Sequence, residues 1–451
     1  MAYINLEHGR TNSTDGRTKS TISVWCKRSK LSNANQYIWG WGENNSSDSY
    51  CRFDTADNIE MHCDGADGTF NSSELFRDTN GWYHIVFSLD GSNGTASLRR
   101  RFWINGVQMD EGKGSISTFS GAVQGDVATQ DLWIGANPRS QQSSALSPFY
   151  GYISHFHYCD GYSYAATDFG EFDSNGVWKP KQTPSVNYGD NGIFLKMEDS
   201  SNMDLDSGTN NITLTTSGTV LSVVESPSNV MATNNPLVKQ QTTYAMQYGN
   251  TWCRTTDAAM FCASSTLGMT KGKYYAEVKC GTIEASSRGE IGISGDVGKM
   301  SRTNDYPGGA TDSYSYASNG AKMEEGTETG YGDSWTTGDI IGIAYDADNN
   351  KLYFSKNGVW QNSGDPTSGS TGTGALSIEA PSNTVDGVFF FACGDNSTGG
   401  STTTEYNWNY GNGYFGTSAI SSEGTNASGI GKFEYDVPTN FTALSTKGLN
   451  E

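Results

Sequence analysis

The stretch GDIIGIAYDADNNKLYFSKNGVW, residues 338–360, decides the fold class of this chain. Two apolar halves are separated by the Asp/Asn-rich segment 346–350. Asp and Asn favour turns, because their short side chains hydrogen-bond the nearby backbone and tolerate left-handed conformations. A second turn signal, Asn357-Gly358, follows the second half, and Asn-Gly is typical of tight hairpins. The stretch therefore predicts an antiparallel meander of short strands.

The rest of the chain has the same texture. Apolar and polar residues alternate in segments 21–26, 83–89 and 151–158, and a period of two is typical of half-buried strands. Segment 102–109, FWINGVQM, carries another Asn-Gly pair between two apolar runs. Sustained helical spacing of apolar residues is missing from the sequence. We therefore predict an all-β protein made of tandem antiparallel β-sandwiches.

Composition and charge exclude several classes of function. The chain has 451 residues, and 49 acidic against 29 basic residues give a net charge of −20. Because an acidic surface repels phosphate groups, we expect no nucleic-acid partner. The longest apolar run, 388–393, is much shorter than the roughly 20 residues of a membrane-spanning helix, and residues 1–10 show no apolar core of a secretion signal.

The 8 cysteines contain no Cys-x-x-Cys pair, and we interpret most of them as buried free thiols.

A change in composition divides the chain. Residues 199–235 are rich in Ser, Thr and Asn, and they separate two blocks with many strand signals. We predict a first domain at 1–198, an irregular connector at 199–235 and a second domain at 236–451. Each domain is long enough to bury a core of its own.

Ordered motifs in the two blocks point to two known folds. In the first block they are TISVWCK (21–27), GWYHIVF (81–87), FWINGV (102–107), LWIG (132–135) and FYGYI (149–153). In the second block they are KYYAEV (273–278), EIGI (290–293) and the segments 338–346 and 352–360. The first set resembles laminin-G-like domains of the concanavalin A-like lectin/glucanase fold, over about residues 1–180. The second set resembles a SPRY domain, over about residues 236–445. Together they imply a concanavalin A-like jelly roll followed by a SPRY-like sandwich.

Further motifs resemble short segments that recur in one group of proteins. They are FGEFD (169–173), GVWKP (176–180), PSNVMAT (227–233) and the ending around FEY (433–435). These look like segments of structural proteins from marine tailed bacteriophages, in which lectin-like and SPRY-like domains occur in tandem. The resemblance implies a non-enzymatic virion surface protein, such as a tail fibre or tail-tip adhesin, which is made in the host cytoplasm.

The resemblance also implies partners. We expect other virion proteins of the tail or capsid, and a host cell-surface glycan or envelope receptor. Two alternatives stay open: a capsid- or tail-attached structural decoration fibre that binds no receptor, and, least favoured, a polysaccharide depolymerase. We expect a homo-oligomer, with a trimer as one possible state. The sequence has no heptad seam, so a trimer would form by sandwich packing.

Catalytic and metal-binding patterns are weak. Retaining glucanases of the concanavalin A-like fold place two acids about 5 Å apart through a Glu-x-Asp strand motif with a third acid. Glu171-x-Asp173 and Glu434-x-Asp436 both lack that third acid. His155 and His157 would share one face of a strand, but no third ligand is evident. We therefore predict no catalytic residue, no metal site and no cofactor.

Carbohydrate binding needs aromatic faces for the sugar ring and planar polar groups for its hydroxyls. In the first domain the candidates are Trp39, Trp41 and Asn44. In the second domain they are Tyr306, Tyr314, Tyr316, Tyr331 and Trp335, which lie among Gly, Ser, Asn and Asp in predicted loops. The resemblance implies ligand contacts in loops at one rim of each sandwich. The alternative is that residues such as Trp39 and Trp335 belong to the cores of bent sheets.

Overall fold

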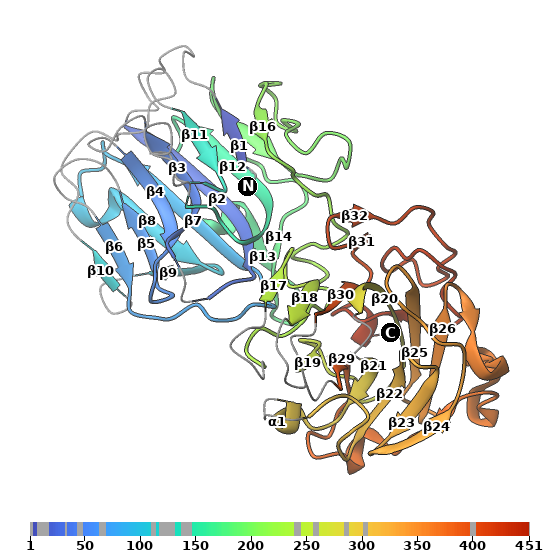
Figure 1. Ribbon diagram of the computed structural model, residues 1–451. Coiled ribbons are helices and arrows are strands. Elements are labelled where there is room, and N and C mark those ends of the chain that lie inside the picture. The colour runs from blue at the N-terminus through green and yellow to red at the C-terminus, as the bar shows by residue number, and fades with distance from the viewer. Residues whose placement is uncertain are drawn as a thin grey trace. The chain divides into compact units, whose positions relative to one another are not determined.

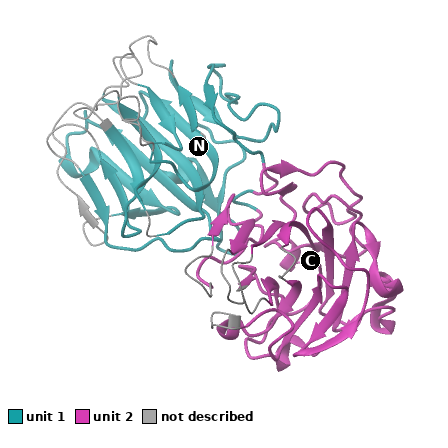
Figure 2. Ribbon diagram, in the orientation of Figure 1, with its two compact units in different colours: residues 1–222, 226–228 teal, residues 223–225, 229–451 magenta. Residues whose placement is uncertain are grey.

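The computed structural model of the chain contains two compact units (Figure 1; Figure 2). Unit 1 comprises residues 1–222 and 226–228, and unit 2 comprises residues 223–225 and 229–451. The structure describes residues 3–6, 18–31, 34–42, 48–62, 69–109, 114–116, 131–136, 147–238, 245–255, 261–283, 288–300, 305–396 and 403–450. Both units are built from mainly antiparallel sheets, which confirms the predicted all-β class. Among the described residues, no helix is long and apolar enough to cross a membrane.

Unit 1 is a sandwich of two sheets. The larger sheet has the strand order β10-β6-β5-β4-β3-β11-β1-β16. Its strands are β1 (Tyr3–Leu6), β3 (Gln36–Gly42), β4 (Asp48–Phe53), β5 (Ile59–His62), β6 (Thr69–Ser72), β10 (Gly114–Ile116), β11 (Leu132–Ile134) and β16 (Thr215–Ser217). The smaller sheet has the order β15-β12-β2-β7-β8-β9. Its strands are β2 (Lys19–Arg28), β7 (Tyr83–Asp90), β8 (Arg100–Ile104), β9 (Val107–Met109), β12 (Gly151–Asp160) and β15 (Ile193–Leu195).

Short elements complete this unit. They are the hairpin of β13 (Gly170–Phe172) and β14 (Trp178–Pro180) and the 3-10 helices η1 (Ala96–Leu98) and η3 (Ala166–Asp168).

The core of unit 1 lies between its two sheets. Ile22, Val24 and Cys26 of β2 point into it, as the alternation predicts. The other face of this sheet is covered as well, by a second cluster that includes Phe169 and Tyr188. Strand β2 is therefore buried along nearly its whole length rather than on one face.

The predicted Asn-Gly hairpin joins β8 to β9. Asn105 and Gly106 have φ values of 49° and 78°, which the tight hairpin turn requires at both positions. The ring of Trp178 lies directly against Gly106, where an added Cβ would approach it to 2.8 Å. The turn thus confirms the sequence prediction and also seats the β13–β14 hairpin.

Residues 199–235, which were expected to form an irregular connector, are shared between the two units. The carboxylate of Asp206 accepts a hydrogen bond from the N–H of Ile212 at 3.0 Å, and Ile212 belongs to the core of unit 1. Strand β16 pairs with β1 at the edge of the larger sheet. Met231 belongs instead to a cluster of unit 2. Parts of this segment therefore pack into the cores of the two units, although its composition is polar.

Unit 2 is a second sandwich. Its nine-stranded sheet contains β17 (Ala245–Gln247), β18 (Trp252–Thr255), β20 (Lys273–Ile283), β25 (Ile340–Asp346), β26 (Lys351–Lys356), β27 (Val359–Trp360), β28 (Leu376–Ser377), β30 (Thr404–Asn409) and β33 (Thr442–Ala443). Its six-stranded sheet contains β19 (Phe261–Ser264), β21 (Gly289–Ser294), β22 (Ser313–Ala317), β23 (Ala321–Glu324), β24 (Thr327–Gly330) and β29 (Phe390–Asp395). Shorter elements are β31 (Tyr414–Phe415), β32 (Ser418–Ala419), α1 (Val297–Met300), η4 (Gln361–Ser363), η5 (Pro366–Thr371), η6 (Pro381–Asn383) and η7 (Gly448–Asn450).

The predicted meander is present as β25, β26 and β27, which pair in chain order. Asn357 and Gly358, at the turn between β26 and β27, have φ values of 48° and 81°. Ile341 and Ile343 of β25 point into the main core of unit 2. This part of the sequence was correctly predicted from its turn chemistry.

Residues 411–450, which we call the C-terminal extension, form a second small core on the outer face of the nine-stranded sheet. Phe433 and Phe441 of the extension pack with Tyr275 and Tyr353 of that sheet. Outward-facing residues of β20 and β26 are therefore buried. Apart from β33, which pairs with β20 within that sheet, the extension adds a third layer to the sandwich.

The cysteines in the described residues are buried. Those that are free thiols include Cys26, Cys159, Cys253, Cys262, Cys280 and Cys393. This confirms the interpretation of most cysteines as buried thiols. Cys63 lies outside the described residues.

Candidate functional site

The structure buries the two aromatic candidates of the first domain. Trp39 and Trp41, on β3, are 1% and 4% exposed. They pack against Phe87 and Tyr158 of the facing sheet, at ring-centroid distances of 6.1 and 5.1 Å. A ring enclosed between two sheets has no free face for a sugar, so burial corrects the expected binding role to a core role. Asn44 lies outside the described residues.

Three candidates of the second domain form an aromatic cluster in its core. Tyr316 lies 5.5 Å from Tyr331 and 6.2 Å from Trp335, measured between ring centroids. Phe354 of β26 packs against both tyrosines. Tyr316 belongs to β22 rather than to a loop. These residues therefore join the two sheets, and the predicted binding role is corrected for them as well.

The two remaining tyrosines lie closer to the surface. Tyr314 is also on β22 and is buried, but its hydroxyl reaches the Oε1 atom of Glu325 at 3.4 Å. Tyr306 is partly exposed, and the guanidinium of Arg288 lies 6.0 Å from the centre of its ring. Tyr314 therefore connects the core to a group of carboxylates at the rim.

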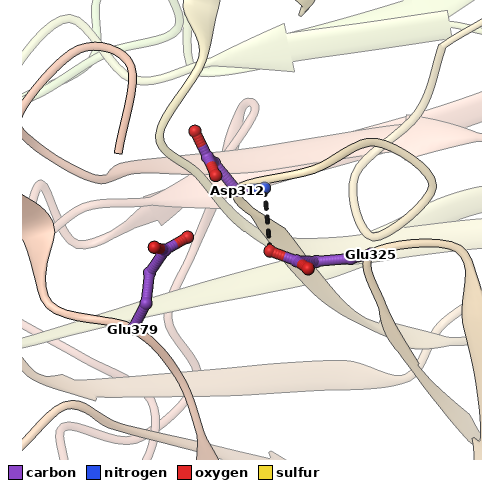
Figure 3. Close-up of side chains that lie close together, drawn as sticks. All are labelled: Asp312, Glu325 and Glu379. Carbon is purple, nitrogen blue, oxygen red and sulfur yellow. Dashed lines mark hydrogen bonds between the residues drawn. The ribbon is translucent and has the colours of Figure 1, made fainter. Parts of the chain in front are cut away.

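That group consists of Asp312, Glu325 and Glu379, which we call the carboxylate cluster (Figure 3). One oxygen from each side chain lies within 4.8 Å of the others. Among the described residues, no other set of three His, Cys, Asp or Glu side chains converges in this way. The sequence alone does not reveal the cluster, because its members belong to separate segments of the chain.

Turns position these carboxylates. Asp312 directly precedes β22, and Glu325 occupies the turn between β23 and β24. Both have positive φ, at 58° and 50°. The N–H of Asp312 donates to Oε1 of Glu325 at 3.1 Å, and the N–H of Val385 donates to Oδ2 of Asp312 at 3.0 Å. Glu379 approaches from the segment that follows β28. The loop backbone thus holds the acids together despite their like charge.

The proximity of these acids changes their titration. Burial, a hydrogen bond to the carboxyl of Asp312 and the charges of Asp312 and Glu325 raise the pKa of Glu379 to about 7. A hydrogen bond between two carboxyl groups requires that one of them holds a proton. Such a group relieves its repulsion by holding a proton or by binding a cation.

The geometry does not match a glycosidase pair. In glycoside hydrolysis the two acids stand on either side of the scissile bond, about 5 Å apart or more. Oxygens of Asp312, Glu325 and Glu379 instead converge on one another within 4.8 Å. The carboxylate cluster therefore gives no support to polysaccharide cleavage.

The histidine pair of β12 does not converge on one point. The strand has a bulge between Ser154 and His157, and His155 has a φ of 46°. Nδ1 of His155 contacts Oγ of Ser154 at 2.7 Å, whereas Nδ1 of His157 contacts the hydroxyl of Tyr188 at 2.9 Å. Burial lowers the pKa of both imidazoles. Both rings still pack against Phe194, at centroid distances of 6.2 and 4.0 Å, but their Nδ1 atoms have different partners.

Comparison with known families identifies both domains. Residues 2–162 match the family described as Concanavalin A-like lectin/glucanases superfamily, and residues 273–377 match the SPRY domain family. The chain carries a concanavalin A-like domain followed by a SPRY domain. The C-terminal extension lies beyond the range of the SPRY match.

Two curated proteins are similar to short parts of the chain. The dual specificity protein kinase splA of Dictyostelium discoideum is 46% identical over 57 residues, which are 12% of this chain and 2% of that protein. The Ran-binding proteins 9/10 homolog of Drosophila melanogaster is 33% identical over 105 residues, which are 23% of this chain and 11% of that protein. The chain therefore spans only a small part of the length of either relative.

Two solved structures are similar to part of the chain. The SPRY domain of human HERC1 is 15% identical, with a TM-score of 0.28, over 38% of this chain and 96% of that chain. The stonustoxin structure is 14% identical, with a TM-score of 0.28, over 39% of this chain and 26% of that chain. At these TM-scores the two similarities carry no argument about function.

Proposed function

We propose that this chain is a non-enzymatic surface protein of a bacteriophage virion, a tail fibre or tail-tip adhesin that binds a glycan or another envelope receptor of the host cell. The tandem of a concanavalin A-like domain and a SPRY domain carries this proposal. Both are rigid sandwiches whose loops are free to bind. Many copies on one particle would raise weak single-site affinity through effective concentration. The chain is made in the host cytoplasm and assembled there.

The motifs that resemble phage structural proteins supply the virion part of the proposal. FGEFD (169–173) and GVWKP (176–180) form the β13–β14 hairpin, on which Phe172 and Val177 are 59% and 51% exposed. The indole N–H of Trp178 donates to Nδ1 of His84 at 3.0 Å and anchors the hairpin. Exposed apolar side chains on an anchored hairpin suit contact with another virion protein or a second copy of this chain.

For the glycan, we favour a surface of the first domain beside the end of β12. Tyr162 is 39% exposed, and the ring of Tyr164 lies 6.1 Å away and nearly parallel to it. The side-chain amide of Asn187 donates to the hydroxyl of Tyr162 at 2.9 Å, and its backbone N–H donates to the hydroxyl of Tyr164 at 2.8 Å. Aromatic faces fixed beside a planar amide are the groups that sugar rings need.

A structural fibre without receptor binding is the second candidate. One observation favours it: Trp39, Trp41, Tyr316 and Trp335, which were expected to bind, are all core residues. The second domain then keeps only Tyr306 as a partly exposed aromatic candidate. Such a protein would attach to capsid or tail and would not bind cells.

A glycan array probed with the labelled full-length chain tests the proposal. We expect binding to a bacterial surface polysaccharide, reduced at least about tenfold by Tyr162→Ala, because stacking on an aromatic ring is lost. Tyr150→Ala is the matched control, since Tyr150 is 38% exposed but its ring is covered by the ammonium of Lys30 at 4.6 Å. Equal loss in both variants would argue against the Tyr162 surface.

The remaining outcomes separate the alternatives. Absence of glycan binding, together with labelling of phage particles by an antibody against the chain, would favour the structural fibre. Absence of labelled particles would contradict the virion proposal. Release of reducing ends from the polysaccharide would show an enzyme.

A further inference from the structure

The core of the SPRY domain brings two thiols into contact. Cys253 lies on β18 in the nine-stranded sheet, and Cys393 lies on β29 in the six-stranded sheet. Their Sγ atoms are 3.5 Å apart, and both residues are fully buried. The contact therefore runs across the sandwich, between strands that are 140 residues apart in the chain.

We propose that Cys253 and Cys393 are a disulfide site, which closes when the chain meets an oxidising medium and then ties the two sheets of the SPRY domain together. An S–S bond is about 2.05 Å long, so the sulfurs must approach each other by about 1.5 Å. Both sulfurs already contact each other inside one core, so closing the bond requires the side chains and their two strands to adjust only by this distance. The inference does not depend on the proposed function.

The neighbouring cysteines are poorly placed to compete. Cys253 and Cys280 flank Tyr406 of β30 on its two sides in the same sheet. Two strand spacings therefore separate them, about 9–10 Å. Cys262 packs with Ala392 in a separate cluster, on the other face of the sheet that carries Cys393. Among the described cysteines of this unit, Cys253 and Cys393 are the pair whose sulfurs are in contact.

The chemistry balances with a peroxide as oxidant. One thiol sulfur attacks an oxygen of hydrogen peroxide, the O–O bond breaks, and a sulfenic acid and one water form. The second sulfur then attacks the sulfenic sulfur, the S–O bond breaks, and the hydroxyl leaves as water with the second thiol's proton. Two electrons pass from the sulfurs to the peroxide. The indole N–H of Trp408 contacts Sγ of Cys393 at 3.2 Å and can stabilise negative charge on that sulfur.

Burial makes this reaction slow in the folded chain. It raises the pKa of Cys253 well above its usual value, and the hydrogen bond to Cys393 adds to this effect. The thiolate is the reactive form, so little of it is present at neutral pH. The pair therefore stays reduced in a cytoplasm and oxidises on long exposure or while the domain opens.

The direct test is oxidation of the full-length chain by hydrogen peroxide. Remaining thiols are then blocked by alkylation, and the chain is digested without reduction for mass spectrometry. We expect one cross-linked peptide pair containing Cys253 and Cys393, lighter by two hydrogens than the reduced pair. Thermal unfolding of unit 2 should shift upward by about 10 °C, because the bond closes a long loop in the unfolded chain. Reduction should reverse both changes.

Variants make the result specific. Cys253→Ala and Cys393→Ala should lose the peptide and the stabilisation, whereas Cys280→Ala, equally buried but outside the contact, should keep both. The chain is also oxidised by hydrogen peroxide while it refolds from urea. The thiols are then accessible, so burial no longer slows their oxidation. If the wild-type chain forms no such bond under either condition, or if Cys253 or Cys393 pairs with another cysteine, the proposal is overturned. The peptide map of the wild-type chain decides this even if an alanine variant fails to fold.

Discussion

The carboxylate of Glu277 accepts a hydrogen bond from the backbone N–H of Glu434 at 2.8 Å. The N–H of Tyr435 donates to the other oxygen, also at 2.8 Å. Tyr275 and Asn409 donate to the same carboxylate from the sheet. One buried acid therefore fixes the C-terminal extension to the outer face of the SPRY sandwich.

Glu277→Ala should destabilise unit 2 by about 3 kcal/mol, because two backbone N–H groups and two side-chain donors lose their acceptor. Denaturant unfolding measures the loss, and limited proteolysis should cut within residues 411–450. Glu423→Ala is the control, since Glu423 forms only a half-exposed ion pair with Lys432 at 3.0 Å. That change should cost less than about 1 kcal/mol. Equal effects of the two substitutions would contradict the anchoring role of Glu277.

The stability of unit 2 should fall as the pH rises from about 5 to about 8. Burial raises the pKa of Glu277 to about 7 and that of Glu290 to about 8, both above the ordinary 4.5. The folded state therefore binds protons that the unfolded state has released, and this contribution is lost as the pH rises through those values. Hydrogen exchange of β20 and β21 amides, corrected for intrinsic rates, measures the change. Glu290→Gln should flatten the profile, and an unchanged slope would count against this account.

The stability of unit 1 should change with pH in the opposite direction, and should fall as the pH falls. Burial lowers the pKa of His84 to about 3 and that of His157 well below its ordinary value of 6.5. Below pH 6.5 the unfolded state then binds protons that the folded state does not bind, so stability is lost as the pH falls below that value. The protection of β2 and β7 amides, corrected for intrinsic exchange rates, should fall between about pH 7 and about pH 5. Constant protection of these amides across that range would show that the buried imidazoles do not control it.

Gly106→Ala should destabilise unit 1 by about 2 kcal/mol. Gly106 has a φ of 78°, and an added Cβ would meet the ring of Trp178 at 2.8 Å. Gly94→Ala is the matched control, because its Cβ would meet no atom within 4 Å. Thermal unfolding compares the two. A control that is as damaging as Gly106→Ala would remove the steric argument.

Glu379→Gln should raise the unfolding temperature slightly, by about 1–2 °C, at a pH above 7 but not near pH 5. The pKa of Glu379 is raised to about 7, so its charge adds to those of Asp312 and Glu325 only above that pH. Glu171→Gln on the exposed β13–β14 hairpin is the control and should have no pH-dependent effect. Destabilisation by Glu379→Gln at high pH would show that the carboxylate is needed in its charged form.

The parts of the fold that were predicted correctly are those set by local chemistry. Asn105-Gly106 and Asn357-Gly358 determine their turns through positive φ, and the alternation around β2 and β25 determines which side chains face the cores. Burial of the opposite face was not predictable from period two, because the covering segments come from elsewhere in the chain. This is why Trp39 and the strand positions Tyr314 and Tyr316 were misplaced.

The carboxylate cluster could not be predicted either. Asp312 and Glu325 lie in two separate turns and Glu379 lies in the irregular segment after β28, and none of them stands out in the sequence. Only the pairing of β21, β22 and β23 and the path of the segment after β28 bring them together. The Cys253–Cys393 contact has the same origin, since it depends on how two sheets face each other.

Receptor binding can be tested by adsorption of the labelled full-length chain to marine bacterial cells, with and without free surface polysaccharide. We expect saturable binding to cells of the host, which the polysaccharide competes away and which Tyr162→Ala weakens while Tyr150→Ala does not. A folded chain in its native oligomeric state that binds no cells across a panel including the host would contradict the receptor-binding claim.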